Sequence, residues 1–170
     1  MSKIIHNNPT VGFTLIELLV VTVIIFTISG LGMAGYNRFN QVQVLKQSAE
    51  DLKSVLRDAQ NRAAVGQKHS DCDSPPRILD HWRFTIDDAN TYIISGSCQG
   101  VTFSSSSFDT PTNITLSPTS GTVDFKPLGQ GITDGLTGTI TLTNSALGSS
   151  IDNIDITIAP SGDITVGTMY

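Results

Sequence analysis

The chain has 170 residues, enough for one domain with a substantial core plus one extended element, but not comfortably for two domains. Its formal net charge of −5 is unevenly distributed. Between Arg38 and Lys68 six basic residues stand against three acidic ones, whereas after Arg83 the only basic residue is Lys126, against eight aspartates. An acidic second half repels a phosphate backbone, so we expect no nucleic-acid partner, although solubility alone also explains such a charge.

A long apolar run near the N-terminus is the most informative part of the sequence. From Phe13 to Gly35 it reads FTLIELLVVTVIIFTISGLGMAG, 23 residues with a single charge. As a helix it is long enough to cross a hydrocarbon core of ~30 Å. Three interpretations compete: a cleaved secretory signal, an ordinary membrane anchor, and a segment that occupies the membrane temporarily. The run is too long for a secretory signal.

Glu17 lies near the beginning of this run. A carboxylate inside a bilayer costs roughly 2.5 to 3.5 kcal/mol on insertion scales, which makes Glu17 a functional candidate. It needs a cationic partner, unless it is an interfacial acid that the helix dipole favours.

The residues around Glu17 carry a resemblance to a known family. Gly12-Phe13-Thr14-Leu15-Ile16-Glu17 resembles the processing signature of the type IV pilin-like family, which includes type IV prepilins and type II secretion pseudopilins. The resemblance implies that prepilin peptidase cuts between Gly12 and Phe13, removes residues 1–12 as a leader, and methylates the new amine of Phe13. It also implies that Glu17 is the assembly charge, paired with the N-terminus of a neighbouring subunit. Glycine suits the cleavage position because it has no side chain to obstruct a protease.

The same resemblance implies partners and a location. We expect prepilin peptidase, other pilin or pseudopilin subunits, the inner-membrane assembly platform and, before assembly, membrane lipid as partners. The subunit would be a single-pass inner-membrane protein with an extracytoplasmic head, and after assembly part of a pilus or a periplasmic pseudopilus. Lys3 and the initiator amine precede the span and Arg38 follows it, so charge alone favours this orientation only slightly.

Beyond Tyr36 the chain becomes polar but keeps a helical repeat. Apolar residues recur at steps of three and four, at Val42, Leu45, Ala49, Leu52, Leu56, Ala59 and Ala63. We predict one helix from about Phe13 to about Val65, roughly 80 Å long. Residues 13–35 would be its transmembrane and assembly half, and residues 36–66 its amphipathic half.

Two alternatives bear on this helix. A sustained stripe also fits a coiled coil, but its three alanines favour close packing against a sheet. Gly30, Gly32 and Gly35 each cost about 1 kcal/mol of helix propensity. They mark either a flexible joint or a surface for close packing.

After Asp80 short β-branched and aromatic runs replace the helical period. The predicted strands cover 81–86, 91–95, 101–103, 113–116, 122–125, 138–143, 154–159 and 163–166. One long helix followed only by strands predicts an α+β fold, with the helix packed on an antiparallel β-sheet or β-sandwich head at residues 67–170. The strand spacing from Val123 to Ile164 resembles the C-terminal half of the GspH/FimT group of pseudopilins and minor pilins.

The two cysteines, Cys72 and Cys98, are too few for a disulfide-framework miniprotein or for the ligands of a structural zinc site. One bridge between them would tie the loop after the helix to the second strand and stabilise the head by about 2 to 4 kcal/mol. Gly96-Ser97-Cys98-Gln99-Gly100 also has the outline of a nucleophile elbow, with His69 or His81 as the base. An elbow precedes a helix, however, and no helical pattern follows Gly100.

Other candidate sites are weaker. Asp71 with Asp73, or Asp152 with Asp155, could contribute oxygen ligands to calcium. No EF-hand spacing is present, so solvated loop acids are the simpler interpretation, and we expect neither a metal nor a cofactor. The stretch 161–170 has no Lys or Arg, which argues against the DNA-uptake role of some minor pilins. We therefore expect a non-enzymatic filament subunit; the alternative is a permanently anchored extracytoplasmic binding module.

Overall fold

The computed structural model describes residues 12–73, 76–133, 138–148 and 152–170, with the side chains of residues 31–34 and 71 left out. The chain divides into two units, Met1–Phe39 and Asn40–Tyr170. One helix, α1 (Leu15–Ala64), contributes to both. This helix confirms the predicted one, and both its ends lie inside the predicted range.

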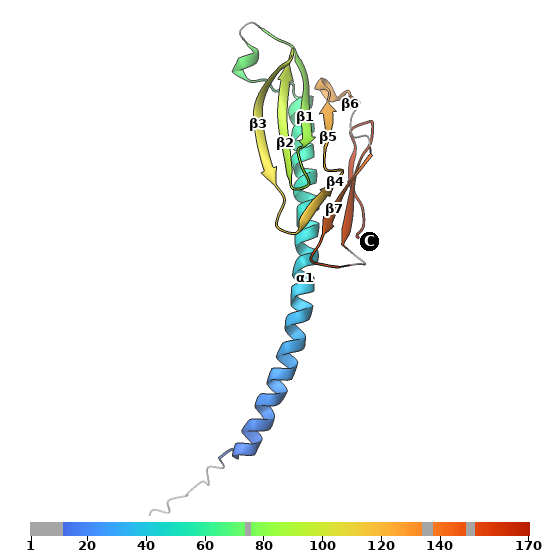
Figure 1. Ribbon diagram of the computed structural model, residues 1–170. Helices are drawn as coiled ribbons and strands as arrows, with labels where there is room; N and C mark the ends of the chain where they lie inside the picture. The colour runs from blue at the N-terminus through green and yellow to red at the C-terminus, as the bar shows by residue number, and fades with distance from the viewer. Residues whose placement is uncertain (1–11, 74–75, 134–137, 149–151) are drawn as a thin grey trace, which may run out of the picture. The chain divides into compact units, whose positions relative to one another are not determined.

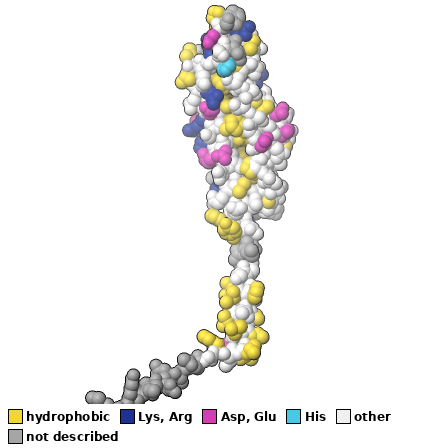
Figure 2. Space-filling model, turned by 90° about the vertical axis from the view of Figure 1, so that its left-hand side faces the viewer, with side chains coloured by type: hydrophobic (Ala, Val, Ile, Leu, Met, Phe, Trp, Pro, Cys, Tyr) yellow, Lys and Arg dark blue, Asp and Glu magenta, His cyan; other side chains and the backbone are white. Residues whose placement is uncertain are grey.

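From residue 15 to residue 28, α1 is apolar on every side apart from Glu17. Figure 2 shows hydrophobic side chains along this segment. The large ones are exposed, namely Leu15, Ile16, Leu18, Leu19, Val20, Val21, Val23, Ile24, Ile25, Phe26 and Ile28. The hydroxyls of Thr22 and Thr27 donate to the carbonyls of Leu19 and Ile24, each at 2.8 Å. The helix thus satisfies its own hydroxyl groups and presents an all-round hydrophobic surface, which is typical of helices that are buried or cross a membrane.

The helix is continuous through the glycine-rich stretch. A Cβ added at Gly30 or at Gly35 would meet no other atom within 4 Å. Neither glycine therefore serves a close approach within the described part of the chain.

The second unit contains two antiparallel sheets (Figure 1). The first sheet has the order β3-β2-β1-β5-β6 and the second the order β4-β7-β8-β9. The strands of the first sheet are β1 (Leu79–Ile86), β2 (Thr91–Cys98), β3 (Val101–Asp109), β5 (Gly121–Phe125) and β6 (Ile132–Thr133). Those of the second are β4 (Ile114–Ser117), β7 (Gly138–Asn144), β8 (Asn153–Ile158) and β9 (Ile164–Val166). Short 3-10 turns occur at Ser70–Cys72 and Pro127–Gly129.

The α+β class is confirmed, and each predicted strand is present. Three features differ from the prediction. Strand β2 extends to Cys98, although its predicted range ended at Ser95. The short strand β6 was not predicted, and β3 extends to Asp109 although its predicted range ended at Phe103. Serines have little strand preference, but here they pair with β2 across an irregularity between Ile94 and Gly96, where Ser104 has a φ of 49°.

Polar side chains shape the turns of the first sheet. Between β1 and β2, the Asp88 carboxylate accepts hydrogen bonds from the backbone N–H groups of Asn90 and Thr91, at 2.6 and 2.8 Å. Between β2 and β3, Gln99 and Gly100 have φ values of 47° and 82°. Two consecutive residues in the left-handed region form the kind of two-residue turn that matches the twist of a hairpin.

The buried face of α1 forms the centre of the second unit. Of the predicted stripe, Val42 is half-buried, and Leu45, Ala49, Leu52, Leu56, Ala59 and Ala63 are buried. These six residues join one hydrophobic cluster with strand residues of both sheets, among them Trp82 and Ile140. The stripe therefore packs on the sheets, which favours that interpretation over the coiled coil.

Side-chain hydrogen bonds attach α1 to the strand-rich part at both ends of this stripe, to the end of β7 and to the turn between β8 and β9. The buried Asn144 amide donates to the carbonyl and to the side-chain oxygen of Gln41, at 3.0 and 3.1 Å. Further along, Gln60 donates to the carbonyl of Gly162 at 2.8 Å. These bonds fix the axial position of the helix, which apolar contacts alone specify poorly.

We predict that Leu52→Ala lowers the free energy of unfolding of the second unit by about 2 to 5 kcal/mol, because it leaves a cavity where both sheets meet the helix. Val65→Ala is the control, since Leu52 is 1% exposed and Val65 76%. Denaturant unfolding of the detergent-solubilised full chain, followed by fluorescence of its one tryptophan, measures the difference. Equal losses in the two variants would contradict the packing described here.

Candidate functional site

The residues of the predicted processing site lie just outside α1. Gly12, Phe13 and Thr14 precede the first helical residue, and all three are exposed. Phe13 is 85% exposed, and a Cβ added at Gly12 would meet no atom within 4 Å. The peptide bond between Gly12 and Phe13 therefore lies in accessible, non-helical backbone, as proteolysis requires.

Thr14 and Glu17 form the N-terminal cap of α1. The Thr14 hydroxyl accepts a hydrogen bond from the Glu17 backbone N–H at 3.3 Å, and it lies 3.5 Å from the Glu17 carboxylate, to which it donates. The Thr14 carbonyl accepts from the Leu18 N–H at 3.2 Å, the first bond of the helix. This arrangement resembles a capping box, which uses threonine at the cap and glutamate three residues later. Sequence reasoning missed this role, although the Thr-x-x-Glu spacing was visible.

Glu17 has no cationic partner among the described residues. No ion pair in that part of the chain includes it. Its carboxylate is therefore stabilised locally by the Thr14 hydroxyl and by the positive end of the helix dipole. An external cation can still approach, because the cap is exposed.

Within the described residues, α1 is the one helix long and apolar enough to cross a membrane. Its most apolar part is unburied and lies near the N-terminus. The strand-rich second unit begins at Asn40, after the potential membrane segment. The charged residues of that unit therefore lie outside the segment.

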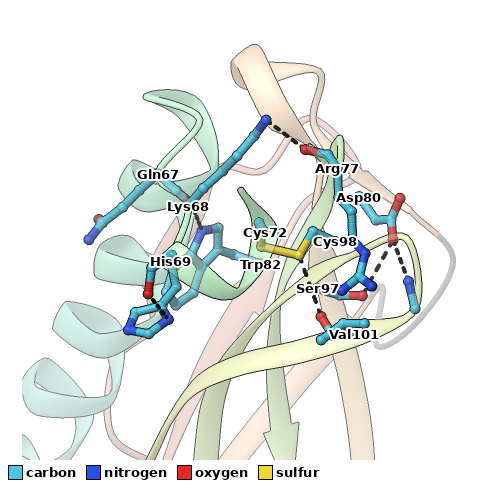
Figure 3. Close-up of a disulfide and its surroundings, with 12 residues drawn as sticks. Gln67, Lys68, His69, Cys72, Arg77, Asp80, Trp82, Ser97, Cys98 and Val101 are labelled. Carbon is cyan, nitrogen blue, oxygen red and sulfur yellow. Dashed lines mark hydrogen bonds between the residues drawn. A yellow bond between two sulfur atoms is a disulfide. The ribbon is translucent and has the colours of Figure 1, made fainter. Parts of the chain in front are cut away.

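Cys72 and Cys98 are joined by a disulfide (Figure 3). Their Cα atoms lie 6.1 Å apart, and both residues are buried. The bridge connects the turn after α1 to the end of β2, which is the connection that the sequence suggested. Beside it, the Trp82 indole donates to the carbonyl of Gln67 at 3.0 Å, so the same turn is also attached to β1.

The disulfide removes Cys98 as a nucleophile. Gly96 and Cys98 lie in β2, which continues through a tight turn into β3, not into a helix. A Cβ added at Gly96 would overlap the Phe103 ring, so the absence of a side chain at Gly96 leaves room for this ring on the neighbouring strand. The histidines are engaged elsewhere: His69 stacks near Phe103 with 6.4 Å between ring centroids, and His81 lies 3.8 Å from the Asp124 carboxylate. The residues of the elbow pattern therefore serve packing and the bridge.

Asp124 also binds Arg83 through two hydrogen bonds of 2.7 and 2.8 Å. This pairing raises the pKa of the Arg83 guanidinium above its usual range. The cluster of Arg83, Asp124 and His81 joins β1 to β5 on the face of the sheet that points away from the core.

No group of three His, Cys, Asp or Glu residues that could hold a metal ion occurs in the described residues. Of the aspartates considered for calcium, the Asp71 side chain lies outside that description. Asp155 accepts hydrogen bonds from Thr141 at 2.7 Å and from the Tyr170 hydroxyl at 3.0 Å. The bond to Asp155 raises the pKa of Tyr170. Asp155 thus stabilises the pairing of β7 and β8 and holds the C-terminal residue.

Comparisons with protein-family models, with curated proteins and with solved structures find no match to this chain. The pilin-like resemblance consequently rests on the residues quoted above.

We predict that replacing both cysteines by alanine lowers the free energy of unfolding by about 3 kcal/mol, because the bridge closes a loop between residues 26 apart in sequence. Denaturant unfolding with and without a thiol reductant measures this loss. Reductant should destabilise the wild type by a similar amount and leave the double variant unchanged. A wild type that is insensitive to complete reduction would contradict a stabilising bridge.

Proposed function

We propose that this chain is a structural subunit, a minor pilin or pseudopilin, of a type IV pilus or a type II secretion pseudopilus. Prepilin peptidase cuts between Gly12 and Phe13, the amine of Phe13 is methylated, and the mature chain assembles through α1. Glu17 then pairs with the N-terminal amine of a neighbouring copy. The protein has no catalytic role in this proposal, and its partners are the peptidase, other subunits, the inner-membrane platform and lipid.

One observation carries the proposal. An exposed, non-helical Gly12-Phe13 bond directly precedes a capped helix whose first part, residues 15–28, is apolar on all sides apart from one charge, Glu17, in the first turn. A peptidase at the membrane surface needs an accessible bond at that place. A helix of this kind needs either lipid or other apolar helices around it.

The location of the charge supports the assembly step. Cleavage creates a cation at Phe13, four residues before Glu17 in sequence. In the cap, the Glu17 backbone N–H already donates to the Thr14 hydroxyl. The carboxylate keeps free acceptor positions, because a carboxylate offers about four lone-pair sites. A neighbouring amine can therefore bind without opening the cap, and in a medium of low dielectric constant that pairing is strong.

A second candidate function is a permanently anchored extracytoplasmic binding module. The capping box favours it, because it explains Glu17 by helix initiation without any filament. Under that function the chain keeps residue 1 or is cut near Gly35, and Glu17 has no intermolecular partner.

The N-terminus of the mature protein tests the cleavage step. We predict that co-expression with a prepilin peptidase yields a chain that begins at methylated Phe13, as intact-mass spectrometry shows. Gly12→Leu should block processing without disturbing the fold, because the space around Gly12 is open. A wild-type chain that stays at full length, or is cut near Gly35, would favour the anchored module.

Two substitutions of Glu17 separate capping from assembly. Glutamine can keep the hydrogen bond to Thr14 because it also suits a capping box, whereas alanine removes both the bond and the charge. We predict that Glu17→Gln and Glu17→Ala reduce incorporation into filaments alike, by tenfold or more if the lost pairing is worth about 1.4 kcal/mol. Shearing and immunodetection measure incorporation, with membrane levels of the subunit as the control. Normal incorporation of the glutamine variant would mean that Glu17 acts only as a cap.

A further inference from the structure

A groove runs between α1 and the C-terminal tail of the second unit. One wall is the helix at residues 46–53, and the other is the tail at residues 166–169. Its volume is about 580 Å³. The floor is apolar: Ile154 is buried, and Val166 and Met169 are half-buried. The groove thus leaves apolar side chains of the tail partly uncovered.

The helix wall of this groove is basic. It carries Lys46 and Lys53, and Arg57 continues the row, because residues seven and eleven positions after Lys46 return to the same side of a helix. Of the described residues in the groove, Glu50 alone is acidic, and it pairs with Lys53 at 3.1 Å. Asp163 lies beyond the groove, beside Arg57. No ion pair in the described chain includes Lys46, so its charge is uncompensated.

Four aspartates form an acidic patch on another side of α1. Three of them surround Thr91: the carboxylates of Asp88 and Asp109 accept its N–H and its hydroxyl at 2.8 and 3.2 Å, and the Asp87 N–H donates to its carbonyl at 3.0 Å. The fourth, Asp51 of α1, borders the same small cavity as Asp109. All four are exposed, and in the described part of the chain no Lys or Arg pairs with them.

The groove and the acidic patch are complementary in charge, and both include apolar side chains. Beside the patch, Pro111 is exposed and Phe108 is half-buried. The two surfaces also lie at the same level of α1, because Glu50 borders one and Asp51 the other, and consecutive helical residues point about 100° apart. Two copies with parallel helices can therefore bring the patch of one to the groove of the other without a shift along the helix axis.

We propose that the groove binds the acidic patch of a second copy of this chain, side by side and with parallel helices. The basic side chains then face the four aspartates, and Pro111 and Phe108 cover the apolar floor. Complementary charges fix the orientation and the choice of partner. The contact joins unlike surfaces, so each copy keeps a groove or a patch for a further neighbour. This inference uses only residues of the second unit and depends neither on cleavage at Gly12 nor on Glu17.

Crosslinking of the full chain in membranes tests this contact. One copy carries Thr168→Cys at the groove, and a differently tagged copy carries Thr112→Cys beside the patch; both threonines are exposed. A flexible bis-maleimide should join the two tagged chains, and should not join two copies that both carry Thr168→Cys. The natural cysteines should not react, because they are bridged to each other.

Charge reversal identifies the groups that meet. Lys46→Glu in the groove copy, or Asp87→Lys in the patch copy, should lower the yield of crosslinked dimer about tenfold, because like charges then face each other. The combination of both should restore the yield. Lys68→Glu is the matched control with the same charge change as Lys46→Glu: Lys68 is also exposed, lies outside the groove, and should leave the yield unchanged.

Three results would overturn the inference. One is the absence of the mixed crosslink before any charge is reversed. Another is a yield that Lys46→Glu lowers no more than Lys68→Glu does. The third is a loss in Lys46→Glu that Asp87→Lys neither shares nor restores, which would mean that the groove binds an acidic partner other than this chain. A chain that crosslinks but is never cut at Gly12 would contradict the proposed function alone.

Discussion

The contact between the buried face of α1 and the two sheets is the interaction on which the second unit depends. Neither sheet closes on itself, and both contribute inward side chains to a single cluster with Leu45, Leu52 and Leu56. Without the helix, those apolar faces would have only each other to cover them. The alanines of the stripe, Ala49, Ala59 and Ala63, leave room for large strand residues to approach the helix backbone. The pattern of large and small residues on one helix face thus determines where each sheet lies.

The same helix meets two different requirements along its length. From residue 15 to residue 28 its surface is apolar on all sides apart from Glu17, and its threonines bond within the helix. From Asn40 onward, apolar residues occupy one face, and charged residues such as Glu50 and Lys53 form ion pairs on the exposed face, at 3.1 Å. Surface pairs of this kind contribute little to stability, so the second part owes its helical state mainly to packing. The first part must obtain its stability from an apolar environment, whether lipid or other helices.

The sequence predicted the fold well where a period was strong and local. The three-and-four spacing from Leu45 to Ala63 identified the helix and its buried face, and alternation of β-branched residues identified most strands. Prediction failed where strand pairing alone determines the structure. The serines of β3 adopt the strand conformation because they pair with β2. Strand β6 has two residues, which are too few to form a recognisable pattern. The cap at Thr14 was missed for another reason, since the same residues already had an explanation as a processing signature.

The candidate sites likewise divide into those that the sequence predicts and those that depend on the tertiary structure. The disulfide was predictable as one of few options for two cysteines, whereas the ion pair between Arg83 and Asp124 was not. These two residues lie 41 positions apart in sequence and share no motif, so only the pairing of β1 with β5 brings them together. Similarly non-local hydrogen bonds join the turn between β1 and β2 to β4 of the other sheet: the Leu116 N–H donates to the Ala89 carbonyl at 2.7 Å, and the Asn90 amide donates to the Ile114 carbonyl at 2.9 Å.

The magnitudes at Glu17 decide what its charge can do under the proposed function. A carboxylate at the centre of a bilayer costs roughly 2.5 to 3.5 kcal/mol. The helix dipole returns about 0.3 to 1 kcal/mol, and a cap at Thr14 contributes about 1 kcal/mol to the helix that carries it. Glu17 lies near the N-terminal end of the apolar segment, so burying its carboxylate there costs less than at the centre of a bilayer. The helix dipole and the cap offset much of that cost. Under the proposed function, Glu17 would therefore remain in an isolated membrane-inserted subunit without unfolding it. Pairing with a second subunit would then add little to the stability of the fold. The main effect of that pairing would be on register, because a neighbour shifted by one helical turn would place an amine against hydrocarbon and leave the carboxylate unpaired.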